Sequence, residues 1–159
     1  MDQITIDSTF KRFDESMPQK YVKKILDARI YDLALETPVE KAPLLSQRFN
    51  NNILLKREDL QPVFSFKVRG AYNKLRCLSD AQRSAGVIAA SAGNHAQGLA
   101  LAAKKMNVNA TIVMPVTTPE SKVDAVRSRC ANVVLIGDNY DAAATHANQL
   151  VQEQGLTYI

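Results

Sequence analysis

A lysine flanked by two apolar residues is the first feature of this sequence that could do chemistry. Lys67 lies between Phe66 and Val68 in the segment Ser65–Ala71, which reads SFKVRGA. The segment is typical of a helix start with Ser65 as its cap, so we expect partial burial and the helix dipole to lower the pKa of Lys67. A neutral amine can condense with an aldehyde. The alternative is a structural lysine whose stem covers an amphipathic helix.

A second group of polar residues lies where an apolar run ends. Residues 87–98 read VIAASAGNHAQG, which is typical of a strand followed by a helix. Ligands of open parallel sheets bind at the carboxyl ends of the strands. Gly93 would let the backbone approach a ligand, while Ser91, Asn94 and the first helix amides could donate to a carboxylate or phenolate. The alternative is a tight turn with Asn94 as the helix cap.

The same turn also resembles the nucleophile elbow of serine hydrolases. Residues 89–93 match the pattern G-x-S-x-G with alanine in place of the first glycine, which would make Ser91 the nucleophile. A catalytic triad would also need a later histidine. The histidine that lies away from the turn is His146, which falls in the middle of a predicted helix. The hydrolase interpretation therefore lacks a partner for Ser91 and is kept only as an alternative.

Composition excludes several other classes of protein. Of the 159 residues, 46% are hydrophobic and 23% are charged, which fits one globular domain rather than a disordered or fibrous chain. No apolar run reaches the roughly 20 residues of a membrane span, and the N-terminus lacks the apolar stretch of a signal peptide. We therefore expect a cytoplasmic protein that has no membrane partner.

Few residues could bind a metal or form a disulfide. The chain has two histidines, and its two cysteines, Cys77 and Cys130, lie far apart and outside any metal-binding spacing. We expect neither a metal site nor a disulfide scaffold, and we expect both cysteines to be small buried packing residues. The glycines do not form a dinucleotide or triphosphate loop.

The formal net charge of +4 is concentrated in one segment. Residues 56–76 hold six basic and two acidic side chains, an excess that equals the charge of the whole chain. Such an excess can attract phosphate or carboxylate, although a solvated helix face is the plainer interpretation. No aromatic platform, long basic run or zinc-finger spacing accompanies it, so we expect no nucleic-acid partner.

The elements that must position these residues alternate regularly after residue 87. Predicted strands are 87–90, 110–114, 132–136 and 157–159, and predicted helices are 95–106, 118–129 and 140–154. Upstream, the spacing predicts an amphipathic helix over 21–35, a short helix over 41–49, a strand over 53–56 and a polar loop over 57–62. Thr118 would cap the helix that follows it, with Pro119 first in that helix. Strands separated by helices of this length predict right-handed βαβ units and a parallel sheet, which is the α/β class.

The last residues predict a strand that is not completed. Thr157, Tyr158 and Ile159 resemble the opening of a strand whose edge nothing covers. We therefore expect this chain to be an N-terminal fragment of a longer protein.

Two long motifs in this order resemble one enzyme family. They are residues 56–74 (KREDLQPVFSFKVRGAYNK) and residues 91–98 (SAGNHAQG), and the similarity extends from about residue 20 to the end, including residues 113–115 and 122–127. The chain resembles the threonine dehydratases (threonine ammonia-lyases), pyridoxal phosphate enzymes of the tryptophan synthase β-subunit fold type. The lead-in at 60–63 (LQPV) resembles the biosynthetic branch of the isoleucine pathway.

The resemblance implies a cofactor, a reaction and a set of site residues. Lys67 would bind pyridoxal 5'-phosphate as a Schiff base and then act as the base, and Asn94 would bind the cofactor's 3-hydroxyl oxygen. Ser91, Asn94 and His95 would hold the carboxylate of the substrate, which is L-threonine and possibly L-serine. The products would be 2-oxobutanoate and ammonia, and the cofactor would take up the carbanion charge. The intact enzyme would be a homotetramer.

The resemblance leaves relatives to be distinguished. Serine racemases carry a serine, thought to be a second acid/base, where this chain has Ala92, so elimination is favoured over racemisation. A catabolic threonine or serine dehydratase, a racemase-like enzyme and a non-catalytic α/β fragment remain alternatives.

The resemblance also implies a division of the chain. We expect a flexible arm over 1–20, the N-terminal part of the large catalytic domain over 21–86 and a small parallel α/β domain over 87–159. The phosphate-binding loop, the residue facing the pyridine nitrogen and an ACT-like regulatory domain would lie beyond Ile159. We therefore expect this chain to be inactive, or nearly so, by itself.

Overall fold

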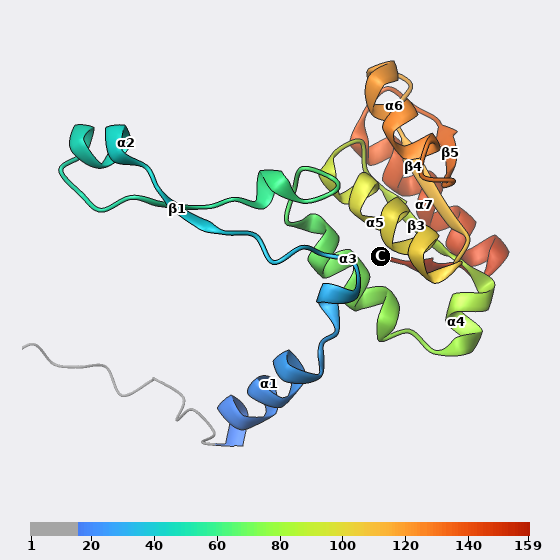
Figure 1. Ribbon diagram of the computed structural model, residues 1–159. Coiled ribbons are helices and arrows are strands. Elements are labelled where there is room, and N and C mark those ends of the chain that lie inside the picture. Colours follow the sequence, from blue (N-terminus) through green and yellow to red (C-terminus); the bar gives the residue numbers. More distant parts are fainter. Residues whose placement is uncertain (1–15) are drawn as a thin grey trace, which may run out of the picture.

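The computed structural model describes residues 16–159, and its elements follow the predicted order closely after residue 87 (Figure 1). The helices are α1 (Ser16–Asp27), α2 (Pro43–Arg48), α3 (Lys67–Arg76), α4 (Asp80–Ala85), α5 (Asn94–Met106), α6 (Glu120–Arg127) and α7 (Tyr140–Gln154). The strands are β1 (Val39–Lys41), β2 (Leu54–Lys56), β3 (Val87–Ala90), β4 (Ala110–Met114), β5 (Asn132–Leu135) and β6 (Thr157–Tyr158). Two short 3-10 helices, η1 (Ile30–Asp32) and η2 (Glu58–Leu60), precede α3.

A parallel sheet with strand order β5-β4-β3-β6 forms the centre of the fold. Each of its ladders is parallel, with Val87 opposite Ala110 and Thr111 opposite Asn132. The chain first adds strands on one side of β3 and then crosses back, through α7, to place β6 on the other side. The predicted α/β class with βαβ units is confirmed.

Alternate residues of β3 pack into two different cores, as a strand buried on both faces requires. Val87 and Ala89 join the core that contains α3, α5 and α6. Ile88 and Ala90 join the core that contains α7. The helices therefore cover both faces of the sheet, with α5 and α6 on one side and α7 on the other (Figure 1).

Helix α3 packs with the residues that follow 87. Ala71, Tyr72 and Leu75 of α3 share a buried cluster with residues of β3, β4, α5 and α6. This places the lysine-bearing helix directly against the α/β unit. The predicted division of the chain at residue 86 stays a prediction, and most of the predicted arm over 1–20 lies outside the described residues.

The helix predicted over 21–35 is wrong in its extent. Helix α1 ends at Asp27, and the chain continues through η1 into an extended segment. The segment leaves the helix because Leu35 pairs instead with the Gln61 side chain, donating to Oε1 at 2.9 Å and accepting from Nε2 at 2.8 Å. The apolar face of α1 is exposed, with Leu26 78% accessible.

The arm over residues 39–56 was only partly predicted. Strand β2 and helix α2 were expected, but β1 was not, because its three residues show no period and follow a proline. Strands β1 and β2 pair antiparallel, with Val39 opposite Lys56, and α2 lies at the far end (Figure 1). Most of the large apolar side chains of the arm, including Leu44 and Phe49, are exposed.

The ends of two helices show where local sequence signals succeed and fail. Asn139 caps α7 by accepting from the Ala142 amide at 3.0 Å, and Gly155 ends it with φ 66°. The prediction that Thr118 caps α6 is wrong, since Pro119 occupies that position with extended backbone. Thr118 Oγ1 is buried and has no hydrogen-bond partner among the described residues.

The cap of α7 gives a direct test of this helix. Asn139→Ala removes the acceptor for the Ala142 amide, so we expect the free energy of unfolding to fall by about 1 kcal/mol. Asn148→Ala, inside the same helix, is the matched control and should raise stability by a few tenths of a kcal/mol, since alanine is the better helix former. Urea unfolding followed by circular dichroism measures both. Equal effects of the two substitutions would contradict the assigned cap.

Candidate functional site

The carboxyl end of β3 leads directly into α5 through a short turn. Gly93 is the residue that precedes the helix, with φ −123° and ψ −152°, and its amide donates to Ser91 Oγ at 3.3 Å. The alternative in which Asn94 caps the helix is wrong, because Asn94 is the first residue of α5 itself. No side chain accepts from the first amides of α5 among the described residues, so these amides point to the end of the sheet as free donors.

This turn lies where the strand order reverses. Strand β3 pairs with β4 on one side and with β6 on the other, which makes its carboxyl end the switch point of the sheet. Strand β6 ends next to the turn, since the Ile159 amide donates to Ile88 O at 2.9 Å. His95 Nε2 lies 3.1 Å from Ile159 O and therefore donates to it in the tautomer that carries the proton there.

The start of α3 touches α5 at a glycine. A Cβ added to Gly98 would lie 3.1 Å from the carbonyl carbon of Lys67 and 3.1 Å from the amide nitrogen of Val68. Only glycine lets two helix backbones approach this closely without displacing one of them. The close contact sets where Lys67 begins its helix relative to α5.

Asn94 lies on the same face of α5 as this contact. Residues four apart in a helix share one face, so Asn94 stands one turn before Gly98 on the side that α3 touches. The Asn94 side chain is exposed, and so is Lys67. The packing therefore brings the two predicted cofactor residues to one end of the α3–α5 pair, beside the Ser91–Gly93 turn.

The local surroundings of Lys67 differ from those expected. The side chain is exposed rather than partly buried, and its Nζ lies 5.4 Å from the centre of the Phe66 ring. Ser65 is buried and its Oγ accepts from the Lys67 amide at 3.3 Å, but Phe66 occupies the position before the helix. Ser65 thus supports the first turn of α3 from one residue further back than predicted.

A partly buried ion pair lies on the other side of α3. The Arg69 guanidinium donates to both oxygens of Glu58, through Nε to Oε2 at 2.8 Å and through Nη2 to Oε1 at 2.8 Å. The two side chains are 21% and 16% accessible. Thr37 Oγ1 at 2.5 Å and Gln61 Nε2 at 3.3 Å donate to the same carboxylate. The hydrogen bonds from Arg69 lower the pKa of Glu58 to about 2, and the pair raises the pKa of Arg69 above its usual range.

Sequence reasoning missed this network. Glu58 and Arg69 are eleven residues apart in different elements, a spacing that carries no periodic signal. The burial of the Gln61 side chain, which is 1% accessible, also becomes visible only in the structure.

The alternative site residues do not come together. His146 lies on α7, on the far face of the sheet from α5, and its Nδ1 is 3.3 Å from Gln149 Oε1. Ser91 therefore has no histidine partner from α7. Within residues 16–159, no group of three or more histidine, cysteine or acidic side chains is placed to hold a metal. In the same part of the chain, no helix is long and apolar enough to cross a membrane.

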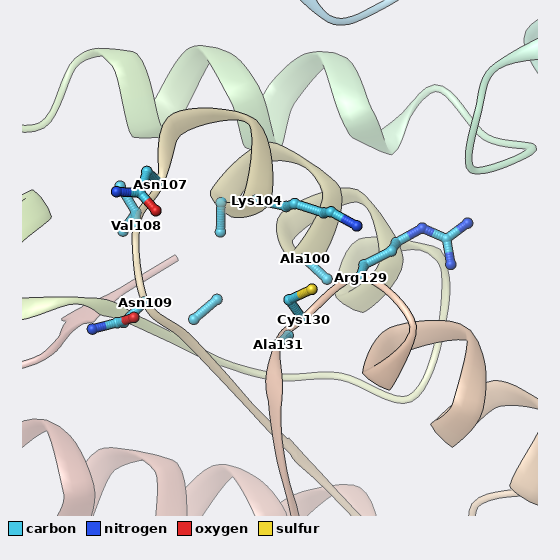
Figure 2. Close-up of a pocket in the computed structure, with 10 residues that line it drawn as sticks. Ala100, Lys104, Asn107, Val108, Asn109, Arg129, Cys130 and Ala131 are labelled. Atoms are coloured by element: carbon cyan, nitrogen blue, oxygen red, sulfur yellow. The ribbon is translucent and has the colours of Figure 1, made fainter.

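A hollow of about 250 Å³ lies at the end of the sheet opposite to the Ser91 turn (Figure 2). Its walls come from residues 107–110, which lead into β4, and from residues 129–131, which lead into β5. These are the amino ends of the strands, so the hollow is separate from the Ser91 turn. Cys130 lines it and is exposed, as is Cys77, so the expectation that both are buried is wrong.

Comparison with known proteins agrees with this arrangement. Residues 30–159 match the family described as pyridoxal-phosphate dependent enzyme. The chain is 53% identical over 140 residues to threonine dehydratase 1 biosynthetic, chloroplastic, of Solanum lycopersicum. The aligned region covers 88% of this chain and 23% of that protein. The chain thus spans about a quarter of the length of this relative. These matches confirm the family resemblance of the two motifs.

Solved structures show the same fold. The processed form of threonine deaminase isoform 2 from Solanum lycopersicum matches with a TM-score of 0.87 and 51% identity, over 92% of this chain and 40% of that chain. Maize serine racemase matches with a TM-score of 0.81 and 31% identity, over 87% of this chain and 43% of that chain.

The Gly98 contact is tested by adding one methyl group. Gly98→Ala would press against the backbone of Lys67 and Val68, so we expect the free energy of unfolding to fall by about 1 to 3 kcal/mol. Gly70→Ala in α3 is the matched control, because nothing lies within 4 Å of its added Cβ. That variant should gain about 0.5 to 1 kcal/mol from helix propensity. Urea unfolding compares the two, and a stabilised Gly98→Ala protein would contradict the close approach.

The Glu58–Arg69 pair predicts a loss of stability in acid. The pKa of Glu58 is about 2 when folded and about 4.3 in an unfolded chain, so its contribution is complete above about pH 5 and disappears as the pH falls to 2. Glu58→Gln should therefore cost about 2 kcal/mol at pH 7 and about half as much at pH 3. Urea midpoints of both proteins at the two pH values measure this. If the difference in urea midpoint between the two proteins is the same at pH 7 and at pH 3, Glu58 is not ionised in a stabilising pair.

Proposed function

This chain belongs to the pyridoxal-phosphate dependent enzymes, and on that premise we propose that it carries the lysine-bearing part of a biosynthetic threonine dehydratase. The observation that supports this most is the contact at Gly98, which seats the start of α3, and with it Lys67, against α5. Since the chain spans about a quarter of its tomato relative, we assign the turnover to a longer protein and expect little or none from this chain alone.

The residues present fit the cofactor. An exposed amine at Lys67 is accessible to the aldehyde of pyridoxal phosphate, and Asn94 stands on the α5 face that the start of α3 touches. We propose that Lys67 binds the cofactor covalently and that the Asn94 amide donates to its 3-hydroxyl oxygen. Ser91, His95 and the first amides of α5 would bind the substrate carboxylate, as free donors at a helix start favour an anion.

Each residue then has a defined task in the reaction. When bound, the cofactor supplies an electron sink for the charge left on the substrate Cα. The Nζ of Lys67, once displaced by the substrate amine, would take the Cα proton. The hydroxyl on Cβ then leaves as water, and hydrolysis gives 2-oxobutanoate and ammonia from threonine. Donors at Ser91 and His95 would keep the carboxylate, and hence the Cα–H bond, in one orientation.

Ala92 favours elimination over the related racemisation. Maize serine racemase shares this fold at 31% identity, so racemisation is the chemical alternative. A second proton donor would be needed on the opposite face of the substrate, and the methyl group of Ala92 cannot provide one. A catabolic threonine or serine dehydratase would use the same residues, so L-serine is an alternative substrate. We retain the cytoplasmic location and the homotetramer of the intact enzyme as parts of this proposal.

Labelling with the cofactor tests whether Lys67 is its attachment point. The chain is incubated with pyridoxal phosphate, reduced with borohydride and digested for peptide mapping. Before reduction we expect an absorbance band near the edge of the visible range that Lys67→Ala abolishes, and after reduction we expect the adduct on Lys67.

Lys74→Ala is the matched control, because Lys74 is also an exposed lysine of α3. It should leave the band unchanged. Identical spectra of wild type and Lys67→Ala would show that this chain does not bind the cofactor, and that the proposed activity belongs only to a longer protein.

A further inference from the structure

The first turn of α3 is restrained by contacts on two sides, and α5 provides the contact on one of them. On the other side, Arg69 reaches back to the segments before the helix. We propose that the Glu58–Arg69 pair is a positioning device that fixes the direction in which Lys67 leaves α3. This inference rests on the proposed function of Lys67 and deepens it.

Arg69 ties α3 to three separate places. Besides its two bonds to Glu58 in η2, its Nη2 donates to Leu35 O at 3.0 Å. Its guanidinium carbon also lies 5.5 Å from the centre of the Tyr31 ring in η1. A planar guanidinium that forms a two-point contact with a carboxylate holds its orientation as well as its distance. A lysine at residue 69 could supply the positive charge but not the planar two-point contact with Glu58.

Glu58 is itself held in place. Its carboxylate accepts from Thr37 and Gln61 as well as from Arg69. Gln61 is fully buried and bonds both backbone groups of Leu35. The pair is therefore anchored in a network of satisfied polar groups, unlike an exposed ion pair whose side chains move freely.

The geometry of the helix explains why this restraint acts on Lys67. Residues two apart in an α-helix point about 200° apart, so Arg69 leaves α3 on the side roughly opposite to Lys67. Gly98 meets the backbone at Lys67 and Val68. A contact at the backbone sets the distance between α3 and α5, and the pull of Arg69 toward Glu58 sets the rotation of the turn about its axis. Together they fix both the place and the direction of the lysine.

A neighbouring ion pair provides a matched control. Arg57 binds Asp59 at 2.8 Å and Glu40 on the arm at 2.5 Å. Asp59 is next to Glu58 in the sequence and pairs with an arginine, but this pair contacts β1 rather than α3. Asp59→Asn therefore makes the same charge change as Glu58→Gln without touching the lysine-bearing helix.

The test compares two readouts in the wild-type chain, Glu58→Gln and Asp59→Asn. One is the hydrogen-exchange protection of the amides of residues 67–70. The other is the ratio of reductive labelling by pyridoxal phosphate at Lys67 to that at Lys74, measured at fixed pH by peptide mapping. We expect Glu58→Gln to reduce the protection about tenfold and the labelling ratio several-fold, while Asp59→Asn changes neither.

Two further variants guard against simple unfolding. Thr37→Val removes one donor to Glu58 and keeps the ion pair, so it should lower the ratio by less than Glu58→Gln. Combining Glu58→Gln with Arg69→Gln should lower the ratio by less than the sum of the two single effects, because both substitutions remove the Glu58–Arg69 interaction. Additive effects of the two substitutions would overturn the proposal.

The outcomes separate this inference from the proposed function. If the wild-type chain is labelled equally at Lys67 and Lys74, Lys67 is not a selective site on this chain. That result would overturn both the proposed function and the positioning role. A high wild-type ratio that Glu58→Gln leaves unchanged would preserve the proposed function and overturn the positioning role. An unchanged labelling ratio would overturn the positioning role even if hydrogen exchange at residues 67–70 increased, because the pair would then only stabilise the helix.

Discussion

The close approach of two helix backbones at Gly98 is the constraint on which the candidate site depends. The parallel sheet fixes α5, because β3 and β4 flank it in sequence and its apolar face packs on both strands. Gly98 then brings the backbone of Lys67 to within contact distance of α5. The position of the lysine is therefore determined by the sheet, although Lys67 lies twenty residues before the first strand of that sheet. A side chain at residue 98 would push the backbones of α3 and α5 apart.

Electrostatics complete the restraint. Three of the six basic side chains over residues 56–76 form ion pairs within the chain: Arg57 pairs with Asp59, Arg69 with Glu58 and Arg76 with Asp32. Within residues 16–159, Lys67 and Lys74 form no ion pair. Three arginines of the segment therefore hold parts of the chain together, while the Lys67 side chain is left exposed at the start of α3.

The parts of the fold that local sequence determines were predictable. Strands β3 and β4 and helix α7 have the predicted bounds, because β-branched runs, the Asn139 cap and the Gly155 stop act within a few residues. Helix α1 was predicted too long, since the apolar spacing continues past Asp27 while Leu35 is held by Gln61. Strand β1 depends on pairing with β2 and has no signal of its own. Tertiary contacts decide these segments, and a local pattern does not contain them.

The candidate site divides in the same way. Lys67 and Asn94 were found from their motifs, but their relation in space depends on the Gly98 contact and on Arg69, which only packing reveals. The most direct test of that relation is a nuclear Overhauser measurement between the Gly98 α-protons and the Val68 amide proton in the isotopically labelled chain. A clear cross-peak, together with none from Gly70 to the Val87 amide in β3, is the predicted result. Absence of the Gly98 cross-peak in a folded protein would show that α3 does not begin against α5, and the proposed site would lose its basis.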